Sequence, residues 1–178
     1  MVQSVKFPMR CQNGRVTRNL DARVMAIPAG LVAIGAAAAD FVALADLAQL
    51  PSGAMLRVTR GDHDLLLVHG ESGICAIDDR CPHMAAPLSL GSLEGCVIGC
   101  PLHKGRFNLC DGGIVQFPTT GGLDPDGGYH APWAPVDAPS KAEPTDLKAM
   151  ARAATRVRRL RYYPLRIVND RIEVRLPD

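Results

Sequence analysis

The sequence lacks the features that mark several common functional classes. It contains no G-x-G-x-x-G stretch, which argues against a dinucleotide-binding domain, and no C-x-x-C pair of the kind that opens a zinc knuckle. It shows no internal repeat. His63, His69 and His130 are scattered and lack suitably spaced carboxylate partners, so the sequence offers no candidate mononuclear iron site. We therefore expect no catalysis by this chain alone.

A strong net charge is also lacking, because the 178-residue chain carries a formal charge of +2 at pH 7. The small net charge results from an acidic central segment between two basic ends. Residues 1–39 hold five basic and one acidic side chain, residues 40–146 hold six and fourteen, and residues 147–178 hold nine and three. A general nucleic-acid binder would carry its cationic surface on the folded module itself. The distribution therefore argues against nucleic acid as a partner, and the length suits one domain with appendages.

Cysteine is too sparse for a secreted disulfide scaffold, with six residues in 178. Two of the six, Cys81 and Cys100, stand close to histidines at metal-ligand spacing, so metal binding is the first hypothesis for them. The remaining cysteines are predicted to be small buried side chains or free thiols rather than bridges; they are Cys11, Cys75, Cys96 and Cys110.

Residues 1–39 lack an Arg-Arg pair, and their uncharged stretch from Val24 to Ala39 is too short to span a membrane comfortably. Basic side chains followed by an apolar stretch and small residues are nonetheless the layout of a signal peptide. Proteins exported with their cofactor already bound generally use a twin-arginine signal. We therefore predict an N-terminal extension that is disordered or loosely docked, and a cytoplasmic protein without stable membrane insertion. Export through the extension is the alternative.

Short apolar runs separated by glycine-rich turns occupy residues 41–117. This spacing leaves no room for crossover helices, so we expect antiparallel sheets and an all-β fold. A hairpin that turns at Asn169-Asp170 is expected at the C-terminal end. The predicted strands are 54–60, 64–69, 73–78, 95–99, 105–109, 114–117, 160–168 and 171–176.

The segment 119–158 interrupts this pattern. Its first part, residues 119–146, holds four glycines and five prolines and is predicted to be a long irregular loop. Trp133, the only tryptophan, is predicted to anchor this loop onto the domain. Thr145 is predicted to cap a short basic helix. The apolar face of that helix would consist of Leu147, Met150, Ala154 and Val157. The predicted division of the chain is an extension at 1–39, a folded domain from 40–118 and 159–178, and an insertion at 119–158.

Two short motifs carry the chemistry. Cys81-Pro82-His83 is followed, after sixteen intervening residues, by Cys100-Pro101-Leu102-His103. Each motif lies in a loop between predicted strands and offers one thiolate and one imidazole. Thiolates suit an iron–sulfur core and imidazole suits iron, and a set of two cysteines on one iron with two histidines on the other is the Rieske arrangement. A zinc site with the same four ligands, or side chains that merely pack, are the alternatives.

The match extends beyond the ligands. The stretches C-P-H-M-A-A-P-L-S from Cys81 and C-P-L-H-K-G-R-F-N from Cys100 resemble the Rieske ferredoxins of bacterial ring-hydroxylating oxygenase systems. The resemblance covers residues 41–117 and the C-terminal hairpin. It implies an antiparallel two-sheet base domain with a small cluster-binding subdomain. By this resemblance Cys81 and Cys100 hold a buried iron, His83 and His103 hold an outer iron near the surface, and Pro87 and Leu88 help to shield one [2Fe–2S] cluster.

Rieske proteins of respiratory bc-type complexes resemble C-T-H-L-G-C and C-P-C-H-G-S-x-Y. Their disulfide cysteines correspond to Ala86 and Leu102 here, and the serine and tyrosine hydroxyls that lie near their cluster correspond to Gly105 and Phe107. Hydrogen bonds to cluster sulfur stabilise the reduced state. Without these two donors, we expect a potential toward the low end of the Rieske range of roughly −150 to +300 mV.

The resemblance therefore implies an electron carrier that passes single electrons from a flavin-dependent reductase to a terminal oxygenase. The alternatives are a small Rieske subunit of a larger oxidoreductase such as a nitrite reductase, an exported respiratory subunit, and a zinc-binding or redox-sensing interaction protein. Lys104 places a cation beside an outer ligand and would favour an acidic partner. A basic stripe is either a docking surface or a solvated face; it consists of Arg152, Arg156, Arg158, Arg159 and Arg161.

Overall fold

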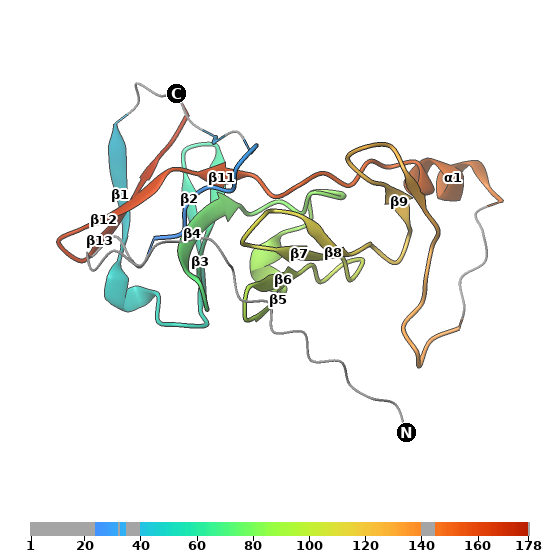
Figure 1. Cartoon of the computed structure of the whole chain (residues 1–178), viewed down its shortest axis with the longest axis horizontal. Helices are drawn as coiled ribbons and strands as arrows, with labels where there is room; N and C mark the ends of the chain where they lie inside the picture. The colour runs from blue at the N-terminus through green and yellow to red at the C-terminus, as the bar shows by residue number, and fades with distance from the viewer. Residues whose placement is uncertain (1–23, 32, 35–39, 140–144, 178) are drawn as a thin grey trace.

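The computed structural model describes residues 24–31, 33–34, 40–139 and 145–177. Two antiparallel sheets form the base of the molecule, and they lie at one end of its long axis (Figure 1). The first sheet contains, in order, β11 (Tyr162–Tyr163), β4 (Gly73–Asp78), β3 (His63–Gly70) and β2 (Met55–Arg60). The second contains, in order, β1 (Phe41–Asp46), β13 (Arg171–Arg175) and β12 (Leu165–Val168). A short helix, η2 (Leu47–Gln49), follows β1 in the chain.

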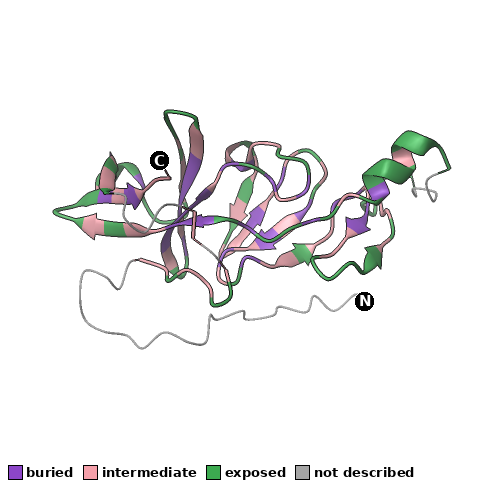
Figure 2. Cartoon of the chain, turned by 90° about the horizontal axis from the view of Figure 1, so that it is seen from above, coloured by how far each residue is buried: buried purple, intermediate pink, exposed green. Residues whose placement is uncertain are grey.

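Strands β3 and β4 separate two hydrophobic cores. Side chains alternate across a strand, so Leu65 and Leu67 enter one core while Leu66 and Val68 enter the other. All four are fully buried. One core lies between the two base sheets, and the other extends toward Cys81 and Cys100. Figure 2 shows the buried residues gathered along these central strands. The two loops that carry the predicted ligands, 81–86 and 100–105, are called the ligand loops from here on. They are held against one side of a sheet that is packed on both faces.

A third sheet forms the middle of the molecule and carries the second ligand loop. Its strands follow the chain as β5 (Ser92–Glu94), β6 (Val97–Gly99), β7 (Arg106–Asn108) and β8 (Ile114–Gln116), and all its pairings are antiparallel. The short helix η3 (Leu88–Leu90) leads into it. The all-β class and the antiparallel sheets predicted from the sequence are confirmed. Strand β5 was missed, because Leu93 is its single apolar residue.

The C-terminal hairpin forms as predicted, but its first strand is divided. Asn169 and Asp170 have positive φ angles of 48° and 59°, as a tight hairpin turn between twisted strands requires. The predicted strand 160–168 breaks at Pro164, whose nitrogen cannot donate to a ladder. As a result β11 pairs with β4 in the first base sheet, whereas β12 pairs with β13 in the second.

The segment 119–158 contains more structure than the sequence indicated. A hairpin of β9 (Gly122–Leu123) and β10 (Tyr129–His130) precedes the helix α1 (Leu147–Ala153). The helix cap is Asp146 rather than Thr145, and its Oδ1 accepts a hydrogen bond from the Ala149 N–H at 2.8 Å. The predicted apolar face is also wrong. Leu147 is 84% exposed and Met150 51% exposed, because the helix ends at Ala153, where the chain turns back toward the third sheet.

Part of the N-terminal segment lies along the base sheet. The Met25 N–H donates to the carbonyl oxygen of Ile74 at 2.8 Å, and the Ile34 N–H donates to that of Tyr162 at 2.7 Å. The basic residues and most of the small residues of the signal-like layout lie outside the described residues. Within the part of the chain that the structure covers, no helix is both long enough and apolar enough to cross a membrane.

Candidate iron–sulfur site

The two ligand loops share one backbone design. The Cys81 N–H donates to the carbonyl oxygen of Ala86 at 2.8 Å, and the Cys100 N–H donates to that of Gly105, also at 2.8 Å. Each bond therefore closes a loop of six residues, 81–86 in the first case and 100–105 in the second. Within each loop the fourth residue after the cysteine has a positive φ, 56° at Ala85 and 58° at Lys104. The sequence thus forms two matching turns, each of which presents a cysteine and a histidine.

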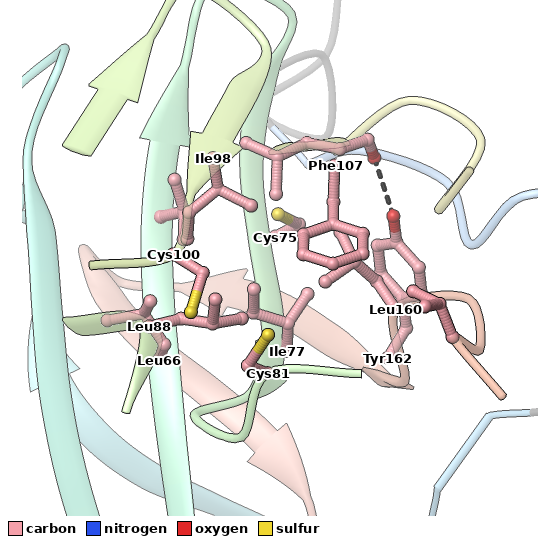
Figure 3. Packing of buried hydrophobic residues seen from close by; sticks show 13 residues of the cluster. Leu66, Cys75, Ile77, Cys81, Leu88, Ile98, Cys100, Phe107, Leu160 and Tyr162 are labelled. Atoms are coloured by element: carbon pink, nitrogen blue, oxygen red, sulfur yellow. Dashed lines mark hydrogen bonds between the residues drawn. The ribbon is translucent and has the colours of Figure 1, made fainter. Parts of the chain in front are cut away.

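The structure brings the four predicted residues together as two pairs. Cys81 and Cys100 are 5% and 4% exposed, and a hydrogen bond joins their thiols. Figure 3 shows the Cys100 sulfur beside Leu88 and the Cys81 sulfur beside Ile77, both within the buried cluster. The imidazole rings of His83 and His103 meet edge to face, with 5.0 Å between ring centroids. Among the described residues, no three His, Cys, Asp or Glu side chains converge on a single metal ion.

The protonation states of these groups fit metal binding. Burial, together with the smaller effect of the neighbouring His103, lowers the pKa of His83 to about 4, so at pH 7 this imidazole is neutral and can act as a ligand. The hydrogen bond between the thiols lowers the pKa of Cys100 and raises that of Cys81. One of the two thiols therefore loses its proton readily, and a bound metal would displace the proton of the other thiol.

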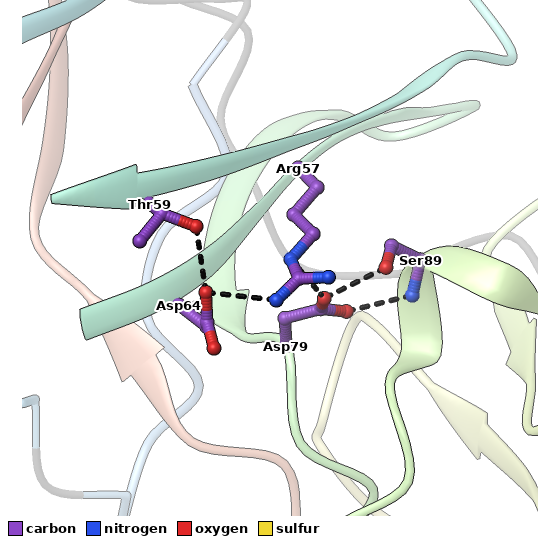
Figure 4. Close-up of polar contacts among 5 residues, drawn as sticks. All are labelled: Arg57, Thr59, Asp64, Asp79 and Ser89. Atoms are coloured by element: carbon purple, nitrogen blue, oxygen red, sulfur yellow. Dashed lines mark hydrogen bonds and ion pairs between the residues drawn. The ribbon is translucent and has the colours of Figure 1, made fainter. Parts of the chain in front are cut away.

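A polar network that sequence reasoning missed fixes the first ligand loop (Figure 4). The Asp79 side chain is almost fully buried and accepts hydrogen bonds from the Ser89 N–H at 2.6 Å and the Ser89 hydroxyl at 2.7 Å. The Arg57 Nε lies 3.3 Å from Asp79 Oδ2, and its Nη2 donates to Asp64 at 2.9 Å. The network joins β2 and β3 to both ends of the loop. The sequence feature that could have revealed the network is Asp79 itself, a carboxylate directly after the buried strand β4.

Asp64 is the outer member of this network. A hydrogen bond from the Thr59 hydroxyl at 2.7 Å, followed by the bond from Arg57, lowers the pKa of the Asp64 carboxyl. The carboxylate form is thereby favoured, which keeps the Arg57 guanidinium oriented between Asp64 and Asp79.

Apolar and aromatic side chains surround the cysteine pair. Leu88 and Phe107 are fully buried in the same cluster as Cys81 and Cys100. Tyr162 belongs to this cluster too, but its hydroxyl donates to the carbonyl oxygen of Leu109 at 2.9 Å (Figure 3). Burial raises the pKa of Tyr162, so the hydroxyl keeps its proton in that bond. The one phenol near the pair is therefore committed to a backbone carbonyl.

The two histidines differ in exposure, which corrects the expectation that both lie near the surface. His83 is only 7% exposed, whereas His103 is half-buried. Thr120 in the segment 119–158 lies against His83, with its Oγ1 3.4 Å from Nε2 of the imidazole. No local pattern indicates this contact, because 37 residues separate the two side chains in the chain.

The remaining cysteines follow the prediction only in part. Cys75 is a buried free thiol, and Cys96 is a half-buried free thiol whose sulfur lies 3.0 Å from the Ser72 hydroxyl. Cys110 is disulfide-bonded, so the expectation of an unbridged residue is wrong there. Cys11 lies outside the described residues.

Comparisons with known proteins point to one family of iron–sulfur proteins. The model of the Rieske [2Fe–2S] domain matches residues 40–126. The ferredoxin component of the naphthalene 1,2-dioxygenase system of Pseudomonas aeruginosa is 45% identical over 74 residues, which are 42% of this chain and 71% of the relative. The corresponding component of Pseudomonas putida is 43% identical over 81 residues, which are 46% of this chain and 75% of the relative.

A solved structure of dicamba monooxygenase with non-heme iron and dicamba superposes with a TM-score of 0.51 at 25% identity, covering 79% of this chain and 33% of that one. The chain belongs to the Rieske [2Fe–2S] family. It is an electron-transfer protein of the ferredoxin type and carries a Rieske [2Fe–2S] cluster.

Proposed function

We propose that Cys81 and Cys100 bind one iron of the cluster, and that His83 and His103 bind the other. The cluster supplies one-electron oxidation and reduction. The proposal is supported by the two matching loops, by the paired thiols in an apolar core, and by the neutral imidazole of His83. In this assignment residues 40–118 and 159–178 form the domain that holds the cluster, and residues 119–158 are an insertion in it.

The chain passes single electrons from a flavin-dependent reductase to a terminal oxygenase and has no catalytic centre of its own. The names of the relatives support this step, because they are ferredoxin components of dioxygenase systems. A cytoplasmic location stays a prediction from the sequence. The acceptor's substrate is set by the oxygenase and not by this chain.

The surroundings of the cysteine pair favour a low reduction potential. Each hydroxyl or N–H that donates to cluster sulfur stabilises the added electron and raises the potential. Phe107 has no donor on its ring, Gly105 has no side chain, and the Tyr162 hydroxyl is bonded to Leu109. The potential is therefore expected near the bottom of the family range of roughly −150 to +300 mV.

An anaerobic redox titration, followed by absorbance and by electron paramagnetic resonance, tests the function. A midpoint near the lower limit supports the carrier between reductase and oxygenase. A midpoint well above zero would contradict it and favour a respiratory subunit.

The ligands are tested by Cys100→Ser, which should abolish the Rieske spectrum, against Cys96→Ser, which should keep it because Cys96 lies outside the paired loops. Loss of the spectrum in Cys96→Ser but not in Cys100→Ser would refute the ligand set.

A further inference from the structure

Two stretches of the segment 119–158 lie against the His83 side of the site. Residues 119–133 and 155–158, called the cap from here on, touch both ligand loops. On the first loop, the Thr120 hydroxyl lies 3.4 Å from His83 Nε2, and the Arg158 N–H donates to the Pro82 carbonyl oxygen at 3.3 Å. On the second loop, the Thr119 N–H donates to the His103 carbonyl oxygen at 2.7 Å. The cap is thus in contact with both ligand loops and links them to each other.

Backbone and side-chain bonds hold the cap in position. The indole Nε1–H of Trp133 donates to the Phe117 carbonyl oxygen at 2.7 Å, and the Trp133 N–H donates to that of Thr119 at 3.2 Å. The backbone N–H of Leu123 donates to the Thr155 carbonyl oxygen at 3.0 Å, and the N–H of Val157 donates to that of Leu123 at 2.8 Å. Val157 itself is fully buried. The segment beside Thr120 is therefore built into the domain at several points.

Glycines allow the close approach that this arrangement needs. Gly121, with φ 71°, follows Thr120, and a Cβ there would collide with the backbone of His130 and Ala131. A Cβ at Gly122 would lie 2.8 Å from the Thr155 carbonyl oxygen. Real side chains do not tolerate either contact, so the two glycines let the halves of the cap lie against each other next to His83.

The second histidine is treated differently. His103 is half-buried, whereas His83 is only 7% exposed. Exposed residues flank both histidines, Leu102 and Lys104 beside His103 and Met84 and Ala85 beside His83, so the difference lies in the imidazoles themselves. Electron transfer weakens steeply with distance, so a partner that touches one ligand directly has a large advantage over a partner kept away by a layer of chain. Only one of the two imidazoles offers such contact.

We propose that the cap closes off His83 and makes His103 the ligand through which electrons enter and leave the cluster. This inference rests on the proposed function, since it assumes that both histidines bind the cluster. It also identifies Thr120 as the residue that covers the outer nitrogen of His83. A partner must then approach over Leu102 and Lys104 rather than over the middle of the histidine pair.

The cap is tested by the reaction of the oxidised, cluster-loaded protein with diethylpyrocarbonate, which attacks accessible imidazole nitrogens. Modified histidines are located by tandem mass spectrometry, and His130, whose side chain is 42% exposed, serves as an internal reference. His103 is expected to react at least tenfold faster than His83. Thr120→Ala should raise the rate at His83 several-fold, whereas Thr145→Ala, an exposed threonine far along the segment, should not. Equal rates at His83 and His103 in the unaltered protein would overturn the proposal.

The electron path is tested with ferricyanide as the oxidant of the reduced protein in a stopped-flow experiment. Leu102→Glu and Met84→Glu each place one negative charge next to one histidine, and both side chains are exposed in the native protein. The first change should slow oxidation by the anion several-fold at low salt, and the second much less. An equal or larger effect of Met84→Glu would contradict exit through His103. The Rieske spectrum of each sample is recorded first, so that a missing cluster counts against the proposed function and not against the cap.

Discussion

Ala85 and Lys104 occupy equivalent positions in the two ligand loops, four residues after Cys81 and Cys100, and both have φ angles close to +57°. A side chain in this left-handed region costs roughly 1–2 kcal/mol, because its Cβ crowds the following carbonyl oxygen. This conformational cost arises once in each turn that presents a cysteine and a histidine, at Ala85 and at Lys104. The strain therefore lies in the loops that bear the proposed ligands rather than in the sheets that support them.

Glycine at either position should stabilise the protein. Ala85→Gly and Lys104→Gly relieve the strain but add freedom to the unfolded chain, so the expected net gain is about 0.5–1 kcal/mol in the free energy of unfolding. Ala43→Gly in β1 is the control, because Ala43 is an exposed strand residue without a positive φ, and this change should destabilise. The measurement is denaturant unfolding of the loaded protein. A loss of stability in both loop variants would show that the left-handed turns are not strained.

Arg57 should matter more than other surface arginines of the domain. Its partner Asp79 is almost fully buried, so Arg57→Leu leaves a buried carboxylate with only Ser89 to bind it. Because the Arg57 side chain is itself 46% exposed, the loss in the free energy of unfolding should stay below the usual cost of breaking a fully buried pair but exceed that of an exposed pair. Arg166→Leu, which removes a pair with Glu173 on the outer hairpin, is the matched control and should cost less than about 1 kcal/mol.

Unfolding of the two variants and the rate of cluster loss from each are the measurements. Arg57→Leu should also release the cluster faster, because the Asp79 network fixes both ends of the first ligand loop. If both arginine variants lose the same stability and keep the cluster equally well, the network has no special role in the site.

The sequence was informative where local chemistry decides the structure. Glycine-rich turns separated the short strands, and the Asn169-Asp170 turn was recognisable from its residues alone. The pairing of Cys81 with Cys100 followed from two motifs of the same composition. These features depend on neighbours in the chain, and a single sequence carries that information.

Features that depend on distant contacts were not predictable. Leu147 and Met150 have the spacing of a buried helix face, yet they are exposed because α1 is short and projects from the domain. His83 is in contact with Thr120, which lies 37 residues further along the chain, beyond the last strand of the third sheet. The role of Asp79 depends on Arg57 in another strand. In each case the burial of a residue is set by a segment whose position the local pattern does not specify.

Gly91 should be required for the alignment of the two ligand loops. It ends η3 with an ordinary negative φ of −96°, so its backbone suits any residue, but an added Cβ would run into the carbonyl oxygen of Gly99 just before Cys100. Gly91→Ala must therefore push η3 away from β6. We expect a loss of more than about 2 kcal/mol and poor cluster retention.

Gly61→Ala separates this steric effect from a conformational one. Gly61 has a φ of 56° but nothing within 4 Å of an added Cβ, so the change should cost only about 1 kcal/mol and leave the Rieske spectrum intact. Thermal unfolding and cluster absorbance of both variants are the measurements. A Gly91→Ala protein as stable and as well loaded as Gly61→Ala would show that η3 and β6 can move apart without consequence.

Cys75 should resist alkylation at a pH where most thiols react. Burial, with a smaller contribution from Cys96, raises the pKa of Cys75 to about 12 from an ordinary value of 9.0. The thiolate is the nucleophile, so between pH 9 and about 12 the folded protein keeps Cys75 protonated and unreactive, whereas the unfolded chain loses that proton. It follows that the free energy of unfolding falls as the pH rises through this window.

Iodoacetamide labelling of the loaded protein at pH 9, read by mass spectrometry, is the test. Cys96, which is half-buried in the turn between β5 and β6, should be labelled while Cys75 is not, and Cys75 should become labelled only in denaturant. Labelling of Cys75 as fast as Cys96 in the native protein would mean that strand β4 opens readily. Since Cys75 packs in the same cluster as Cys81 and Cys100, such opening would also expose the cysteine pair, and the cluster would be lost on the same timescale.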